Sequence, residues 1–147
     1  RSFAAADTSN YGRVKPGDVV YTKSPTGCFP YGIVKQNWMD EEVAVSPLYG
    51  VYTPVSKDAG YLLHTYFEQS QNANNYIRTL AQKGAKNTIN ITTSHFLDKS
   101  IIFPSNEDCV SHLAKMFAVI SAEISLAEKE LELLLRQRKT LLQQLFI

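Results

Sequence analysis

The segment NEDCVSHLAKMFAVISAEISLAEKELELLLRQRKTLLQQLFI, residues 106–147, decides how the rest of the chain is organised. It contains no Gly or Pro, so one helix can run through it from about Asn106. Apolar residues recur at alternating steps of three and four, which is the spacing of a coiled-coil seam. The seam, interrupted at Arg138, consists of Val110, Leu113, Phe117, Ile120, Ile124, Ala127, Leu131, Leu134, Leu141 and Leu145. The pattern predicts an interface for a second copy or another partner.

This predicted helix is too long to be covered by the remainder of the chain. At ~1.5 Å per residue it would form a rod of roughly 60 Å. Leu133, Leu135 and Leu142 widen its apolar stripe, so more than one partner surface can pack on it. Ser105 followed by Asp108 resembles a capping box and would mark the start of the helix.

The first 105 residues predict an α+β domain with a small mixed or antiparallel sheet. Runs rich in Val, Ile, Tyr and Thr, bounded by turn residues, indicate strands over 18–23, 31–35, 42–45 and 50–55. Ser56 can cap a helix through Phe67, and a second helix through Tyr76 and Leu80 would end at Gly84. Further expected elements are a strand at Ile89 and Ile91, a short turn capped by Thr93 or Ser94, and a strand over 101–103 ending at Pro104.

Composition limits the function. With 147 residues, 44% of them hydrophobic, the chain can bury one domain core, which excludes a large multidomain enzyme. Cys28 and Cys109 do not form a Cys-x-x-Cys pair, and the apolar runs are only a few residues long. We therefore expect a soluble protein in the reducing cytoplasm, with no membrane span. A first residue other than Met suggests a fragment or a processed product.

No motif indicates catalysis. The chain has no phosphate-binding Gly-rich loop and no Gly-x-Ser-x-Gly turn, and no acidic pair stands out by its spacing. His64, His95 and His112 lie too far apart in sequence for a helical metal site, so each is expected to be a structural or surface residue. We expect no catalytic residue, no metal and no cofactor on this chain.

Two polar segments of the domain are candidates for contacting DNA. KSPTGCFPY, residues 23–31, offers a cation and two hydroxyls, whereas QKGAKNT, residues 82–88, offers lysines and amides. The candidate contacts are Lys23, Ser24, Thr26, Tyr31, Lys83, Lys86, Asn87 and Thr88, with Arg78 and Lys35 as phosphate ligands. Residues 1–105 carry ten basic against eight acidic side chains, which permits a phosphate-facing surface without demanding one. The alternatives are a loop that packs its aromatics on the sheet and a solvated helix end.

The order of these elements resembles one protein family. GDVVYTKSPTG (17–27), FPYGIVKQN (29–37), VSPLYGVY (45–52), the Gly84 loop, an apolar segment ending at Pro104 and the long heptad helix together look like a specificity subunit of type I restriction-modification systems. Residues 1–105 would be a target-recognition domain and 106–147 a spacer helix. The Pro-x-x-Glu-Gln helix entry of the family is Pro104 to Asp108 here, with an acid in place of the Gln.

The resemblance implies recognition without chemistry. The family's subunits usually hold two recognition domains, with spacer helices that pair antiparallel and set the distance between half-sites. This chain looks like the C-terminal half of such a subunit or a half-size form, so a homodimer would restore a bipartite target. Double-stranded DNA and the methyltransferase and restriction subunits are the implied partners. S-adenosylmethionine, ATP and Mg²⁺ would bind those subunits, in the cytoplasm of a bacterium or archaeon.

Two other readings of the sequence remain open. The near-neutral charge fits a coiled-coil interaction module whose head binds a ligand other than DNA. A hydrolase or nuclease with an unrecognised site would show turnover by the chain alone when a metal is added.

Overall fold

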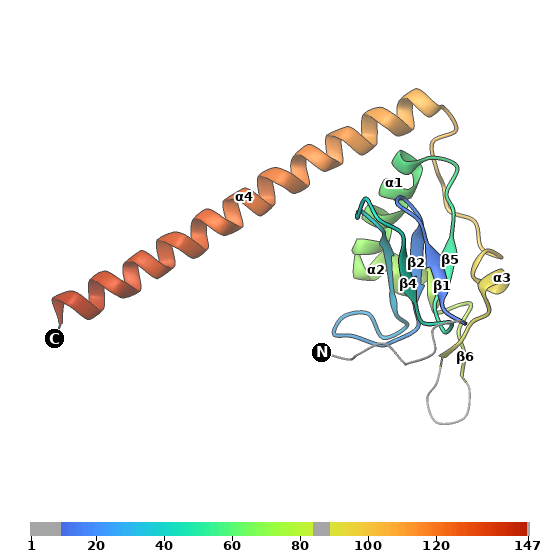
Figure 1. Ribbon diagram of the computed structural model, residues 1–147, viewed down its shortest axis with the longest axis horizontal. Helices are drawn as coiled ribbons and strands as arrows, with labels where there is room; N and C mark the ends of the chain where they lie inside the picture. The colour runs from blue at the N-terminus through green and yellow to red at the C-terminus, as the bar shows by residue number, and fades with distance from the viewer. Residues whose placement is uncertain (1–9, 84–88, 147) are drawn as a thin grey trace.

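The computed structural model describes residues 10–83 and 89–146, and Figure 1 shows a small head from which one helix projects. The strands are β1 (Gly12–Val14), β2 (Val19–Thr22), β3 (Ile33–Gln36), β4 (Val43–Val45), β5 (Gly50–Tyr52), β6 (Gln82–Lys83) and β7 (Ile89–Asn90). The helices are α1 (Lys57–Glu68), α2 (Ser70–Ile77), α3 (Thr93–Phe96) and α4 (Glu107–Leu145). The α+β class and the long C-terminal helix are confirmed.

The strands form small antiparallel sheets. The largest has the order β3-β2-β5, while β1 pairs with β4 and β6 with β7. Along β2, Val19 and Tyr21 are buried and alternate with the half-buried Val20 and Thr22. That alternation arises because successive side chains of a strand point to opposite faces, so one face of the sheet can pack on the helices.

The main core is built from aromatic rings. Tyr21, Phe67, Tyr76 and Phe96 are all buried and belong to one cluster. The rings of Tyr21 and Phe96 stack with centroids 4.7 Å apart, and Phe67 meets Tyr76 edge to face at 5.2 Å. The Tyr76 hydroxyl donates a hydrogen bond to the carbonyl of Phe96 or Lys99, each at 2.8 Å, which ties α2 to the segment after α3.

Helix α1 begins where the sequence predicts. The Ser56 side chain accepts a hydrogen bond from the Ala59 amide at 3.1 Å, so Ser56 is the N-cap. This cap satisfies one of the amides that an α-helix leaves without an internal partner. α1 lies between β3 and α4 and therefore connects the sheet to the projecting helix.

Several expected element boundaries are wrong. Residues 101–103 form no strand: Ile101 packs on the main core and Phe103 on a second cluster, whereas Ile102 is fully exposed. α2 ends at Ile77 rather than near Gly84, because a turn follows and residues 82–83 pair with β7. No strand was expected at β1, which is a three-residue strand paired with β4.

Two predicted helix caps are displaced by one residue. α4 is capped by Asn106, whose side chain accepts from the Asp108 amide at 2.8 Å, and Ser105 does not form the expected capping box. α3 is capped by Thr92, which accepts from the His95 amide at 3.1 Å, rather than by Thr93 or Ser94. In both cases a neighbouring residue has the extended backbone that an N-cap requires.

Candidate nucleic-acid interface and helix interface

The loop of residues 23–31 is held in one conformation. Thr26 and Phe29 exchange backbone hydrogen bonds of 3.1 and 2.7 Å across a tight turn. Gly32 has a positive φ of 101°, and a Cβ there would collide with the Thr22 carbonyl oxygen. The buried Tyr21 donates a 2.6 Å hydrogen bond to the Tyr31 carbonyl. These contacts constrain the backbone of the loop at the turn and at the end that joins β3.

The four predicted loop contacts differ in accessibility. Ser24 and Thr26 are exposed, and Lys23 is half-buried. Tyr31 packs against the main core together with Phe29, as the alternative reading of the loop expected for its aromatics. Ser24 and Thr26 are thus the fully exposed residues among the four predicted contacts of this loop.

Helix α2 contacts this loop through Asn74, one turn before Arg78. The Asn74 side chain donates to the Cys28 carbonyl at 3.2 Å, so this face of α2 lies against the loop. Arg78 is one turn further on, and its amide bonds to the Asn74 carbonyl at 2.9 Å. Residues four apart share a helix face, and Arg78 is exposed. Sequence reasoning missed Asn74, whose contact depends on the tertiary fold.

The remaining predicted cations are Lys35, Lys83 and Lys86. Lys35 on β3 is exposed, but its ammonium lies 3.2 Å from a Glu68 carboxylate oxygen, which offsets its charge. Lys83 belongs to β6, at the lower end of the head in Figure 1. Lys86, Asn87 and Thr88 lie outside the described residues.

Lys99, counted among the basic residues of the domain, has a structural role. Its ammonium donates to the Asn75 carbonyl at 2.7 Å and to the Thr79 hydroxyl at 3.2 Å. It also lies 5.5 Å from the centre of the Tyr76 ring. A cation near the C-terminal end of a helix stabilises the helix dipole, so Lys99 secures α2.

The first part of the predicted helix interface packs on the head itself. Val110 and Ala114 are buried with Ala59 and Leu62 of α1. Leu113 and Phe117 are partly buried against the same cluster. Val110, one of the predicted interface residues, is thus buried in the head, whereas Leu113 and Phe117 are only partly covered by it. α1 presents an apolar face of its own at this point, which the heptad pattern of α4 could not reveal.

Beyond the head, the seam is bare. Ile120, Ile124, Leu131, Leu134, Leu141 and Leu145 are between 43% and 73% exposed. Figure 1 shows this part of α4 extending away from every other element. Monomeric soluble proteins rarely leave a continuous apolar stripe of this length in water. The predicted interface thus begins at Ile120.

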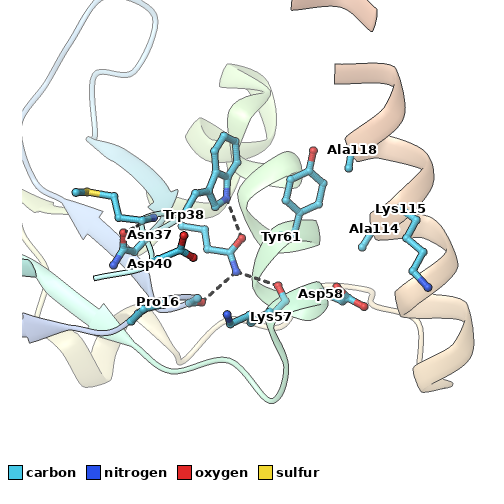
Figure 2. Close-up of a pocket in the computed structure, with 13 residues that line it drawn as sticks. Pro16, Asn37, Trp38, Asp40, Lys57, Asp58, Tyr61, Ala114, Lys115 and Ala118 are labelled. Carbon is cyan, nitrogen blue, oxygen red and sulfur yellow. Dashed lines mark hydrogen bonds between the residues drawn. The ribbon is translucent and has the colours of Figure 1, made fainter. Parts of the chain in front are cut away.

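A groove lies between the head and the start of α4, and Figure 2 shows its lining. It encloses about 280 Å³ and includes Trp38, which is 61% exposed and whose ring centroid lies 5.8 Å from that of Tyr61. Trp38 donates to the Gln36 side-chain oxygen at 2.9 Å, and the Gln36 amide nitrogen bonds to the Gly17 and Lys57 carbonyls. Sequence reasoning did not find this groove, because its walls come from four separate segments.

His64 is buried beside that groove. Its Nδ1 accepts a 3.3 Å hydrogen bond from the Gln36 backbone N–H, whereas its Nε2 makes no hydrogen bond and lies 3.6 Å from a Glu68 carboxylate oxygen. Burial lowers the pKa of His64 and Lys35 lowers it further, while Glu68 acts in the opposite direction. His64 thus joins β3 to α1 from within the head.

Comparison of the chain with family models, with curated protein sequences and with solved structures gives no match. Within residues 10–83 and 89–146, no three His, Cys, Asp or Glu side chains gather as metal ligands would. In the same residues α4 is long and apolar enough to cross a membrane by length and composition alone. A buried core helix of a soluble protein can pass the same test, but the apolar stretch of α4 is mostly exposed, with only Val110 and Ala114 buried against the head.

Proposed function

We propose that this protein is a non-catalytic DNA-specificity component of a type I restriction-modification complex, either half of a two-domain subunit or a half-size form. The head would read a short half-site. The distal part of α4, from Ile120 to Leu145, would join a second copy and set the spacing of a bipartite target. The proposal rests on the sequence resemblance and on one structural observation, the bare apolar seam of α4.

The seam carries the proposal because it extends about 38 Å beyond the packed turns of α4. Five of its apolar side chains are more than half exposed: Ile124, Leu131, Leu134, Leu141 and Leu145. Burying them against another helix yields roughly 25 cal/mol per Å² of apolar area. A spacer helix needs such a surface, and a self-contained enzyme domain does not.

The head offers a surface suited to a DNA groove. Ser24 and Thr26 are exposed hydroxyls on a turn fixed by backbone hydrogen bonds. Arg78, one helical turn after the Asn74 that contacts the loop, would supply a cation for a phosphate. Hydroxyls can bind base edges or phosphates, whereas cations give affinity with little sequence preference. The segment between β6 and β7, with Lys86 and Asn87, would add the remaining base contacts.

The proposed partners are the methyltransferase and restriction subunits, in the cytoplasm of a bacterium or archaeon. Those subunits would bind S-adenosylmethionine, ATP and Mg²⁺ and carry out methylation and cleavage. The width of the apolar stripe, which includes Leu133, Leu135 and Leu142, would let a methyltransferase helix pack beside the second copy.

Selection from a random duplex library tests the proposal. The chain, alone and with its methyltransferase subunit, should enrich one bipartite sequence. Affinity for that sequence should fall steeply with salt, with a log–log slope of about −0.9 per phosphate neutralised. No enriched sequence at any salt concentration would exclude DNA recognition.

The groove at Trp38 favours a second candidate, a coiled-coil interaction module whose head binds a ligand other than DNA. Trp38 is the one tryptophan of the chain, so its fluorescence reports directly on the groove. Under this reading, a metabolite library would change Trp38 emission while duplex DNA would not. Under the DNA-specificity reading, the library leaves the emission unchanged.

A further inference from the structure

The spacing of the bare seam of α4 is compatible with pairing to an antiparallel second copy. Its positions are Ile120, Ile124, Ala127, Leu131, Leu134, Arg138, Leu141 and Leu145. The steps between them are the same when read from either end. An antiparallel second copy can therefore meet every position at once, pairing Ile120 with Leu145, Ile124 with Leu141, Ala127 with Arg138 and Leu131 with Leu134.

We infer that Arg138 selects this antiparallel register by facing Ala127 of a second copy. This inference rests on the proposed self-association and specifies its geometry. Arg138 is exposed, and within the described residues it has no ion-pair partner, whereas Arg136 pairs with Glu132 of its own helix at 3.2 Å. A polar residue at a seam position lowers stability but determines register and orientation.

The surroundings of Ala127 suit an arginine. Ala127 is the smallest residue of the seam, so it leaves room for a long side chain. Glu128 and Glu130 follow it within one turn and place two carboxylates beside the incoming guanidinium. In a parallel, in-register pair, Arg138 would instead face Arg138 of the second copy, and like charges at close range repel each other.

The head contacts of α4 support the same register. A shift by one heptad toward the heads would pair Arg138 with Ile120 and place Leu145 against Leu113, which already packs on the cluster beneath α1. A shift in the opposite direction would pair Arg138 with Leu134, which leaves less room for a long side chain than Ala127 does. The inferred register uses every bare seam position and none of the packed ones.

This register would also set the separation of the heads. The two Ala114 residues, where α4 meets α1, would lie about 55 Å apart along the helix pair. The heads would sit at opposite ends, each on its own α4. Changing the register by one heptad would change that separation by about 10 Å, so Arg138 would determine the spacing of the bipartite target.

Spin-label distances in the full chain test the register. Cys28 and Cys109, both exposed, are first replaced by Ser, and single labels are then placed at Ala122→Cys or Gln143→Cys, two exposed positions of α4 outside the seam. The inferred register predicts equal axial separations of about 32 Å for the two labels. A heptad shift in either direction would make them about 21 and 42 Å, and a parallel pair would bring both labels close together.

Variants of Arg138 complete the test. Arg138→Lys should keep the two distances equal, whereas Arg138→Leu should add unequal populations at the shifted distances while the dimer persists. Unequal distances in the unmodified seam, or equal distances in Arg138→Leu, would overturn the inference. A chain that stays monomeric at all concentrations in sedimentation would overturn both the inference and the proposed self-association, whereas a dimer with another register would overturn the inference alone.

Discussion

The two parts of α4 differ although the helix and its heptad spacing are continuous. In the proximal part, Val110 is buried and Leu113 is partly buried in the cluster that α4 forms with α1. In the distal part, Leu131 and Leu134 occupy equivalent seam positions and are more than half exposed. The same pattern therefore packs on the head at one end and is left exposed at the other. Tertiary context, not periodicity, decides which seam residues are available for association.

The largest expected effect is the loss of self-association when a seam residue of distal α4 is replaced. Leu134→Glu places a charge in the middle of the proposed helix pair, where an unpaired buried charge costs about 3–5 kcal/mol. Self-association should weaken by at least ~100-fold, as measured by sedimentation equilibrium. The thermal unfolding of the head should stay unchanged, and a head that unfolds instead would show that distal α4 belongs to its core.

A matched substitution in proximal α4 should lower the stability of the monomer, which the distal substitution leaves unchanged. Val110→Ala removes methyl groups from the cluster beneath α1 and should lower the free energy of unfolding by about 1–3 kcal/mol, measured by urea denaturation at a concentration where the chain is monomeric. Leu131→Ala is the control, because the monomer leaves that side chain bare. Equal losses of stability in both variants would remove the distinction between the two parts.

We expect Arg78 and Asn87 to contribute to DNA binding in different ways, Arg78 to affinity and Asn87 to sequence preference. Arg78→Ala should weaken binding to all duplexes alike and make the salt slope shallower by about one phosphate, because a cation on a phosphate reads no sequence. Asn87→Ala should cost about 1–3 kcal/mol at a single base pair of the target. Anisotropy titrations with a set of single-substituted duplexes measure both effects, and a uniform loss in the two variants would contradict the assignment of Asn87.

The smallest expected effect is the pH dependence from His64. Its pKa is lowered in the folded state, so as the pH falls below about 6.5 the unfolded chain gains a proton that the folded chain does not. The free energy of unfolding should therefore decrease as the pH is lowered below about 6.5. His64→Gln should flatten the decrease, whereas His112→Gln, on the exposed face of α4, should not. Identical pH profiles for both variants would show that His64 is not the responsible group.

Local signals in the sequence predicted much of the fold. The Ser56 cap, the strands on either side of the 23–31 loop and the long helix depend on nearby residues, and the structure contains all of them. The strand expected over 101–103 is absent: within residues 10–83 and 89–146 this segment pairs with no strand, and Ile101 and Phe103 instead pack on the two core clusters. Apolar residues in a short run cannot distinguish a strand from an extended segment that packs on a core.

The candidate sites were predicted less completely, because they depend on contacts between distant segments. The contact of Asn74 with Cys28, one turn before Arg78, spans 46 residues. The Trp38 groove likewise combines β3, α1 and α4 with the turn that precedes β2. The seam could be predicted from its spacing. Which part of it packs on the head and which part, from Ile120 onward, is exposed depends on the position of α1 in the structure.

The central claim is that the head reads DNA and that distal α4 positions the second head. The most direct test compares the DNA sequences selected by the unmodified chain and by Leu134→Glu. We predict that the unmodified chain enriches two inverted half-sites at one fixed spacing, whereas the variant enriches a single half-site with the same base preferences. An identical motif for both proteins, or no motif for either, would contradict this division of roles between the head and α4.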